Sequence, residues 1–376
     1  MKFVLLLIFA SASVVGHAQS RVTHLEALAH ANFPDIAEFP AELDLIQKVT
    51  TGEIVDRGQG NPWRSESDNA DAPLQRWGRE REIRAKLIRW LVVSREVQEL
   101  IDPKGIQISG ARIGGDLDLN FANIPFPVTL LRCRMEGLLL IGTTTPSLNL
   151  AYSWGKQVTV TTANIVHILS FFAFRSDGQI NLGHTHVGDL YCDAATVTNG
   201  LIANEITVDG DASFSAAYTG NRLPTPFHLN GQLLLQGARI GGFLNFSGGE
   251  FINVGNNGLD LVGATVKGLV FFKTFPGPPG EAQYLDVQGT IDLRTASVGG
   301  IFLDQLHWPP AWGLEGLKYN SIYLPTTAFP EAVRFGLTPN AELGLTWLGL
   351  DRSGSIQPYE QLAKALNNSG DTLGAT

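Results

Sequence analysis

Short segments in which apolar and polar residues alternate recur along most of this chain. The segment Ile108–Leu119 reads Ile-Ser-Gly-Ala-Arg-Ile-Gly-Gly-Asp-Leu-Asp-Leu, and residues 235–246 repeat it with Gly-Ala-Arg-Ile-Gly-Gly unchanged. Further copies begin at Leu261, Leu182, Ala203 and Leu293. Apolar residues two positions apart are typical of a strand with one buried face. Because a single strand–turn unit repeats, the pattern predicts a solenoid whose coils stack on one another.

The glycine and the alanine of the repeat fit a tight corner. Glycine permits left-handed backbone angles, and alanine is small enough to point inward at such a place. We therefore expect the equivalent alanines to be buried and to lie in line along the solenoid axis: Ala111, Ala238 and Ala264.

Hairpins of a β-sandwich are the alternative, because glycine after asparagine or aspartate also marks hairpin turns. Five such pairs occur in the repeat region: Asp177-Gly178, Asn199-Gly200, Asp209-Gly210, Asn230-Gly231 and Asn257-Gly258. The identical six-residue string favours the solenoid, since hairpins have no need to repeat one string at one corner.

The sequence thus predicts a mainly β protein with one continuous right-handed parallel β-helix over residues 105–308, where apolar segments recur about every ten residues. Two or three strands per coil of roughly 20–30 residues would follow. Proline cannot continue a ladder of strands. The proline-rich runs at 224–226 and 276–280 are therefore predicted to be loops that project from the stack.

Both ends of the β-helix are predicted to be covered by helical segments. Residues 19–104 form the N-terminal region and cap, with helices over 19–55 and a polar linker over 58–73 that is rich in Gly, Pro, Ser, Asn and Asp. Residues 309–376 form the C-terminal cap and tail, with a short helix over 356–366.

The strongest helical pattern spans residues 74–93, where Ile83, Leu87 and Leu91 share an apolar face and arginines occupy the other. An uncovered end strand would template aggregation. We therefore expect this helix to cover the first coil with its apolar face. A helix that lies on a membrane surface is the alternative interpretation of its basic face.

Residues 1–18 have the pattern of an export signal. Lys2 gives a basic start, Phe3–Val15 an apolar core, and Gly16-His17-Ala18 a cleavage site. The apolar core is too short to span a bilayer, which needs about 20 residues, although an uncleaved anchor is the alternative. We expect an exported protein (periplasmic, in the cell envelope or extracellular) with no transmembrane segment in the mature chain.

The charge and the cysteine content restrict the range of possible partners and sites. The formal net charge is −9, and the longest basic stretch is that of Arg79–Arg89, so a nucleic-acid partner is not expected. Cys133 and Cys192 would lie two or three coils apart, which is too far for a disulfide. We expect both to be buried as small apolar residues.

Two groups of residues are candidates for chemistry. His184, His186 and Asp189 could contribute zinc ligands, although nothing fixes a further ligand; histidines on a solenoid surface are the alternative. Asp116, Asp189 and Asp211 each follow a glycine at the same corner of the repeat.

That row of aspartates has two interpretations. Stacked carboxylates could bind calcium or act as acid and base on a polysaccharide, with Asp189 and Asp211 on successive coils. Aspartate also simply favours turns. Phe243 and Leu269 occupy the equivalent position in other copies and interrupt the row.

Four motifs in the same order resemble an uncharacterised bacterial family often labelled putative membrane-associated oxidoreductases. They are Gly-Ala-Arg-Ile-Gly-Gly-Asp-Leu-Asp-Leu, Ala85-Lys-Leu-Ile-Arg-Trp-Leu91, Trp312-Gly-Leu-Glu-Gly-Leu-Lys-Tyr319 and Gln357-Pro-Tyr-Glu-Gln-Leu-Ala363. The resemblance covers roughly residues 50–370 and implies a right-handed β-helix similar to pentapeptide-repeat proteins. It supplies no catalytic residues. The oxidoreductase label finds no support in the residues, because the sequence has no Gly-x-Gly-x-x-Gly turn and no Cys-x-x-Cys pair.

These observations predict an exported, non-catalytic β-helix that uses no cofactor. We expect it to bind a protein or polysaccharide partner, or to act as a scaffold, at the cell envelope. A polysaccharide lyase or hydrolase on the same fold is the first alternative. The second is a truncated member of the membrane-attached family without activity of its own, since the sequence resembling the family ends here at Thr376.

Overall fold

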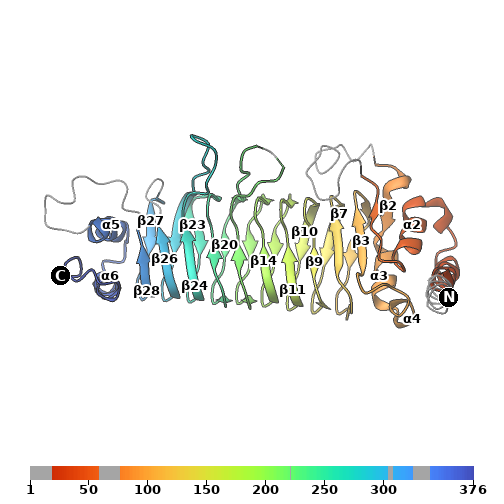
Figure 1. Cartoon of the computed structure of the whole chain (residues 1–376), viewed down its shortest axis with the longest axis horizontal. Coiled ribbons are helices and arrows are strands. Elements are labelled where there is room, and N and C mark those ends of the chain that lie inside the picture. The colour runs from red at the N-terminus through yellow and green to blue at the C-terminus, as the bar shows by residue number, and fades with distance from the viewer. Residues whose placement is uncertain (1–18, 59–76, 221, 304–307, 325–338) are drawn as a thin grey trace, which may run out of the picture.

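The computed structural model describes residues 19–58, 77–220, 222–303, 308–324 and 339–376. Figure 1 shows an elongated stack of strands with helices at both ends. The predicted export signal at 1–18 and most of the predicted linker lie outside the described residues.

The described strands form two parallel sheets of 14 strands each. Sheet A contains β1 (Val55–Asp56), β3 (Ile106–Ser109), β6 (Val128–Leu131), β8 (Thr144–Thr145), β9 (Leu148–Asn149), β11 (Asn164–Ser170), β14 (His186–Tyr191), β17 (Thr207–Val208), β18 (Ala212–Ser213), β21 (Arg239–Ile240), β22 (Leu244–Asn245), β24 (Thr265–Phe272), β26 (Ser297–Leu303) and β28 (Lys318–Tyr323). Sheet B contains β2 (Glu82–Arg84), β4 (Arg112–Gly114), β5 (Leu117–Asp118), β7 (Arg134–Leu139), β10 (Trp154–Thr159), β12 (Arg175–Ser176), β13 (Ile180–Asn181), β15 (Thr196–Val197), β16 (Leu201–Ile202), β19 (His228–Asn230), β20 (Leu233–Leu234), β23 (Glu250–Asp260), β25 (Asp286–Asp292) and β27 (Ala311–Gly313).

The solenoid prediction is confirmed, and the hairpin alternative is wrong for the stack. The strands on either side of Asp209-Gly210, and the strand β23 that contains Asn257-Gly258, are paired in parallel with their neighbours. Among the described residues, antiparallel pairing is limited to isolated bridges, 217 with 225 and 275 with 283. Paired strands also extend beyond residues 105–308 at both ends, because β1 and β2 precede this range and β27 and β28 follow it.

One coil of the stack contains 20–22 residues where nothing is inserted. This length follows from one column of register partners in sheet B: Arg112, Arg134, Trp154, Arg175 and Thr196. Between Thr196 and its next partner, His228, a loop is inserted. A coil therefore runs through two short segments of sheet B and then two of sheet A.

From residue 110 to residue 205, each half-coil turns at a residue with a left-handed backbone. These residues follow one another every 10 or 11 positions along the chain: Gly110, Phe121, Arg132, Gly142, Tyr152, Thr162, Ala173, His184, Ala194 and Glu205. Nine non-glycine residues among the described ones adopt this conformation, which costs roughly 1–2 kcal/mol for an L-residue. This strain is offset because the corners allow the four short segments of a coil to pack around one core.

The two left-handed corners of a coil explain one wrong expectation. Ala111, Ala238 and Ala264 are all buried, as expected. Ala238 and Ala264 precede the register partners Arg239 and Thr265 in sheet A. Ala111, in contrast, precedes Arg112 of sheet B. The three alanines are therefore not in line: the same string fits both corners of a coil, because they have the same backbone geometry.

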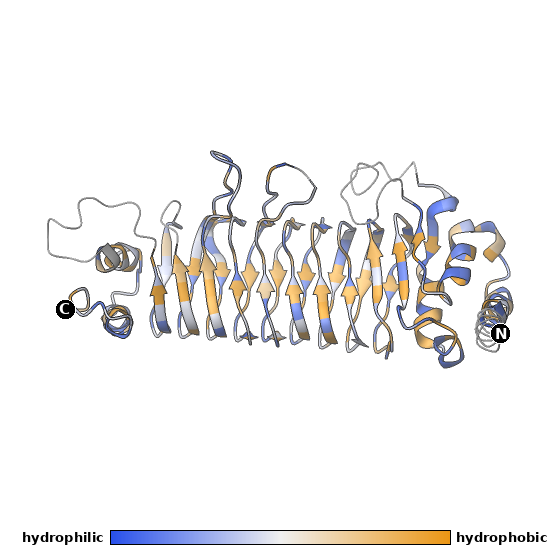
Figure 2. Ribbon diagram, in the orientation of Figure 1, coloured by the Kyte–Doolittle hydropathy of each residue, from blue (hydrophilic) through white to orange (hydrophobic). Residues whose placement is uncertain are grey.

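The core runs along the inside of the stack as columns of aliphatic and aromatic side chains. Figure 2 shows hydrophobic residues at corresponding places on successive strands. Cys133 and Cys192 belong to this core; both are buried and free, as predicted. Burial raises the pKa of the Cys133 thiol to about 12 and raises the pKa of the Cys192 thiol above its ordinary value.

The N-terminal cap contains helical residues 19–32, η1 (Ile36–Glu38), α2 (Pro40–Lys48), η3 (Arg79–Arg81), α3 (Ala85–Val93) and α4 (Arg95–Gln98). The helix predicted over 74–93 is wrong for residues 77–84, which are not α-helical, while residues 74–76 lie outside the described residues. Glu82–Arg84 forms β2, and Ile83 pairs with Ile113. The open edge of sheet B offers this segment a ladder of hydrogen bonds, and that tertiary pairing overrides the helical periodicity. The predicted covering role is kept by α3, where Leu87 and Leu91 are fully buried.

A buried ion pair joins the cap to the first strand of sheet B. Glu42 on α2 is fully buried, and its carboxylate accepts hydrogen bonds from Arg84 Nε at 2.8 Å and Nη2 at 2.6 Å. Asp35 accepts a third, from Nη1, at 2.7 Å. These bonds raise the pKa of Arg84 above its ordinary value, so the guanidinium stays charged inside the cap.

The C-terminal cap contains α5 (Pro339–Leu348) and α6 (Gln357–Asn368). Trp347 on α5 packs edge-on against Trp312 of the last coil, with ring centroids 5.7 Å apart. The predicted helix over 356–366 is confirmed as α6. Its glutamines satisfy backbone groups of the last coil: Gln357 Nε2 donates to Leu317 O at 3.0 Å, and Gln361 Nε2 to Tyr319 O at 2.6 Å.

Both proline-rich runs lie in loops, as predicted. The loops project from one edge of the stack (Figure 1). They contact each other through Tyr218, whose ring packs against Phe275 and whose hydroxyl donates to Pro276 O at 3.2 Å.

Candidate functional site

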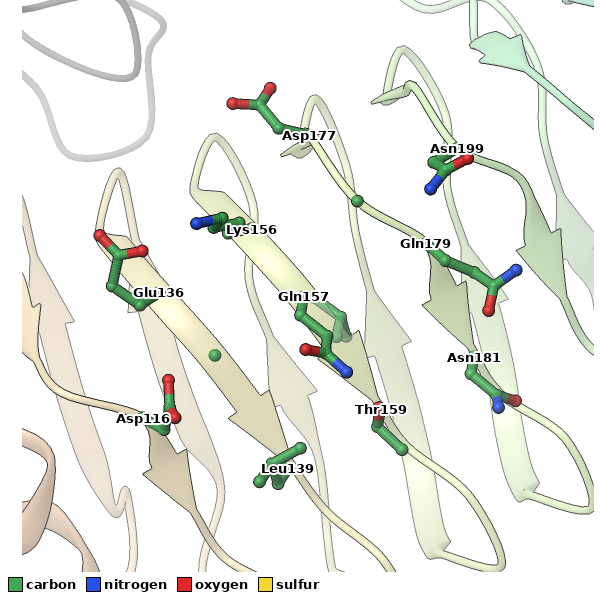
Figure 3. Close-up of a pocket in the computed structure, with 13 residues that line it drawn as sticks. Asp116, Glu136, Leu139, Lys156, Gln157, Thr159, Asp177, Gln179, Asn181 and Asn199 are labelled. Carbon is green, nitrogen blue, oxygen red and sulfur yellow. The ribbon is translucent and has the colours of Figure 1, made fainter.

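A polar groove crosses the strands of sheet B. Its first hollow has a volume of about 740 Å³ and its second about 690 Å³. Both hollows are lined by Gln179 and Asn199, so they form one continuous groove along the stack. Figure 3 shows the polar side chains of the first hollow on consecutive coils.

Glycines form part of the groove floor, and packing explains why. A Cβ on Gly178 would lie 2.0 Å from the carbonyl oxygen of Lys156, and one on Gly137 would lie 2.6 Å from Asp116 Oδ1. Real Cβ atoms do not approach other atoms so closely. The neighbouring coil therefore leaves no room for a side chain here, with backbone against Gly178 and the Asp116 side chain against Gly137.

Strand register aligns the side chains of the groove in rows. Gln157 of β10 is paired with Gly137 of β7. Thr159 of β10 is paired with Asn181 of β13. Neighbouring strands lie about 4.8 Å apart, so polar side chains of adjacent coils lie at this spacing where both partners are polar, as with Thr159 and Asn181.

Most polar side chains of the groove have no partner inside the protein. Within the described part of the chain, no hydrogen bond or ion pair is made by the side chains of Glu136, Lys156, Gln157, Thr159, Gln179, Asn199 and Gln232. Asn181 Oδ1 accepts a hydrogen bond from the backbone N–H of Gly183. Asp177 accepts a bond from Trp154 Nε1 at 3.0 Å and pairs with Arg175 Nε at 3.6 Å. The groove thus offers many free donors and acceptors to a bound molecule.

The predicted catalytic candidates Asp189 and Asp211 lie on successive coils of sheet A, as the spacing suggested. Asp189 Oδ1 accepts the backbone N–H of Asp211 at 2.8 Å, and Asp211 Oδ1 accepts that of Phe243 at 2.7 Å. Each carboxylate therefore holds the next coil in place. This geometry favours the interpretation that aspartate serves the turn.

Asp116 does not belong to that row. It precedes β5 in sheet B, whereas Asp189 lies in β14 of sheet A. The prediction that the three aspartates form a single row is therefore wrong. As with the alanines, the same string occurs at both corners of a coil. Instead, Asp116 lines the groove beside Glu136.

The predicted metal candidates contact different carboxylates. His184 lies at a left-handed corner, with its Nδ1 3.5 Å from Glu205 Oε2. His186 Nε2 lies 2.9 Å from Asp209 Oδ2, and Asp189 binds the Asp211 backbone. Across the residues that the structure describes, no group of three or more His, Cys, Asp or Glu side chains is arranged to hold a metal ion.

Sequence reasoning missed the groove, although its signal was visible. Asp177-Gly178, Asn199-Gly200, Asn230-Gly231 and Asn257-Gly258 attracted attention as hairpin turns. Residues of all four pairs line the two hollows. The four pairs lie on successive coils in sheet B, and this side of the coils becomes a wall of the groove.

No protein-family model matches the chain, and comparisons with curated proteins and with solved structures found no significant similarity. The family resemblance carried by the four motifs therefore stays a prediction. None of the helices in the described residues has the length and apolar character to cross a membrane. Fold and groove together define a parallel β-solenoid with an elongated polar surface groove.

Proposed function

We propose that this protein is an exported, non-catalytic binding protein of the cell envelope, and that the groove of sheet B holds an extended, hydroxyl-rich glycan. The observation that carries the proposal is the set of free side chains in the groove. Gln157 and Gln179 are exposed and Thr159 is half-buried, and the side chain of each makes no hydrogen bond within the described residues. Amides and hydroxyls can donate and accept at once, as sugar hydroxyls do.

A polymer with a regular repeat suits this surface better than a small ligand. Several successive coils contribute polar side chains to the lining, and the groove continues from the first hollow into the second. Several weak contacts at regular intervals add up to useful affinity when one chain joins them.

An extended peptide fits less well. Peptides that bind sheets usually add a strand to a free edge through backbone hydrogen bonds. The groove lies on the face of sheet B, where the ladder between coils already uses the backbone groups of strands such as β7 and β10. Side chains alone would have to hold the peptide.

Binding can be tested with two amides of the groove. The double substitution Gln157→Ala and Gln179→Ala should weaken binding of a neutral oligosaccharide about tenfold or more, because two hydrogen bonds of about 1 kcal/mol each are lost. Isothermal titration calorimetry against a panel of oligosaccharides would measure the change. Asn164→Ala, which removes an exposed amide from sheet A, is the matched control and should bind as the native protein does. Equal affinity in all three proteins would contradict the proposal.

A polysaccharide lyase or hydrolase is the second candidate, because Asp116, Glu136 and Asp177 bring three carboxylates to one groove. Native protein would be incubated with neutral and acidic polysaccharides and the products separated. Turnover that disappears in Asp116→Asn or Glu136→Gln would replace binding by catalysis. The same assay with Asp189→Asn and Asp211→Asn covers the pair on sheet A.

A further inference from the structure

The two ends of the groove differ in charge. The first hollow is lined by three carboxylates and one ammonium group, a net charge of −2: Asp116, Glu136, Asp177 and Lys156. The second hollow is lined by amides, glycines and two aliphatic residues, with no charged side chain. A bound chain therefore meets negative potential at one end and neutral hydrogen-bonding groups at the other.

Lys156 does not make the first hollow attractive to anions. Gly155 and Gln157 are paired with Met135 and Gly137, so Lys156 lies opposite Glu136. Pairing of Gly155 with Ser176 brings it opposite Asp177 on the other side. Lys156 is thus flanked by acidic residues on both neighbouring strands, whose backbones lie about 4.8 Å apart. Like charges repel an anionic ligand there, because the flanking carboxylates outnumber the ammonium group.

Two of the three carboxylates have no hydrogen-bond or ion-pair partner among the described residues. Asp177 already has Trp154 and Arg175 as partners. The carboxylates of Asp116 and Glu136 accept no hydrogen bond and form no ion pair within the described chain. They face the groove from neighbouring strands, β7 and the residue before β5. A cationic group of the ligand would find two acceptors at this end.

We infer that the groove selects glycans by charge: it takes neutral or amine-bearing sugar chains, directs an amine-bearing unit to Asp116 and Glu136, and disfavours polyanionic chains. This inference rests on the proposed glycan binding and adds the class of glycan and its direction. The neutral end around Gln232 and Asn256 then holds the uncharged units of the same chain.

The test uses three oligosaccharides of equal length at mildly acidic pH and low salt: glucosamine oligomers, their N-acetylated form and a uronate oligomer. The full-length protein should bind the amine form about two- to fivefold more tightly than the N-acetylated form, as expected for partly exposed ion pairs. The uronate should bind more weakly than both. Added salt should abolish the preference but leave binding of the N-acetylated form, because screening acts on exposed charges.

Variants separate the inference from the proposed function. Asp116→Asn combined with Glu136→Gln should remove the preference for the amine form, so that the amine form and the N-acetylated form bind equally tightly. Lys156→Gln should weaken uronate binding little or not at all. If the native protein binds the uronate best and Lys156→Gln abolishes that binding, the inference is overturned while glycan binding stands. If none of the three oligomers binds, both fail, and tight binding of an oligolysine peptide instead would identify a basic peptide as the occupant.

Discussion

At the scale of single residues, backbone conformation decides more than side-chain type. The half-coil corner requires a positive φ, and glycine supplies it at Gly110 and Gly237 without strain. Elsewhere the corner holds residues as large as Phe121 and Tyr152. Packing between coils must offset the strain at those positions, since each such residue costs about 1 kcal/mol or more.

Gly237 allows this cost to be measured. A Cβ there would meet only the flexible Glu205 Cγ at 3.3 Å, so space is not limiting at its φ of +65°. Gly237→Val should lower the free energy of unfolding by about 2 kcal/mol, because β-branched residues tolerate this conformation poorly. Gly237→Asn should cost less than about 1 kcal/mol, because asparagine adopts it more readily. Urea unfolding of both variants gives the comparison; equal losses would mean that bulk, and not backbone strain, matters at this corner.

At the scale of elements, the two caps solve the same problem in different ways. The N-terminal cap covers the core of the first coil with apolar side chains from α3, while β1 and β2 extend the sheets. The C-terminal cap adds α6, whose glutamines bond the backbone carbonyls of Leu317 and Tyr319. Unpaired edge groups are costly and invite association, so each end needs either pairing or covering.

Docking of α3 can be tested at one buried position. Leu87→Asp should lower the free energy of unfolding by about 3 kcal/mol or more, because an unpaired charge would be buried against the first coil. Val93→Asp, on the same helix but 47% exposed, is the matched control and should change it by less than about 0.5 kcal/mol. Similar values for the two variants would show that α3 is not docked.

At the scale of the whole molecule, the protein behaves as a one-dimensional array. Each coil contacts chiefly its neighbours, and stability is the sum of coil and interface contributions. Such an array has only two weak places, its ends. The last strand of sheet A, β28, is protected on its outer edge by α6.

Removal of α6 should therefore make the protein associate through β28. A shortened protein of residues 1–355 should form dimers or larger species that increase with concentration. Light scattering coupled to size-exclusion chromatography would detect them. The double substitution Gln357→Ala and Gln361→Ala keeps the helix and removes only its bonds to the edge, so it should associate less. A monomeric shortened protein at all concentrations would show that the edge needs no cover.

Much of the architecture was determined by the sequence by itself. Alternation of apolar residues at the half-coil spacing, with a glycine or small residue at each corner, is a local pattern, and a parallel solenoid is the fold that makes all its copies equivalent. Burial of Cys133 and Cys192 followed from the same periodicity. So did the neighbouring positions of Asp189 and Asp211, which differ by one coil.

Tertiary structure alone decided which of the two sheets each copy of the repeat joins. The string around Ala111 and that around Ala238 are identical, yet they lie in different sheets, because insertions and a half-coil period of 10 or 11 residues shift one against the other. Ile83 changed from a predicted helix to a strand because an open sheet edge was available to it. The groove arose in the same way: Glu136, Lys156 and Gln179 lie on different coils, and no sequence motif links them. Only the stacking of coils, which sets the register between strands, brings their unpaired polar groups into one line.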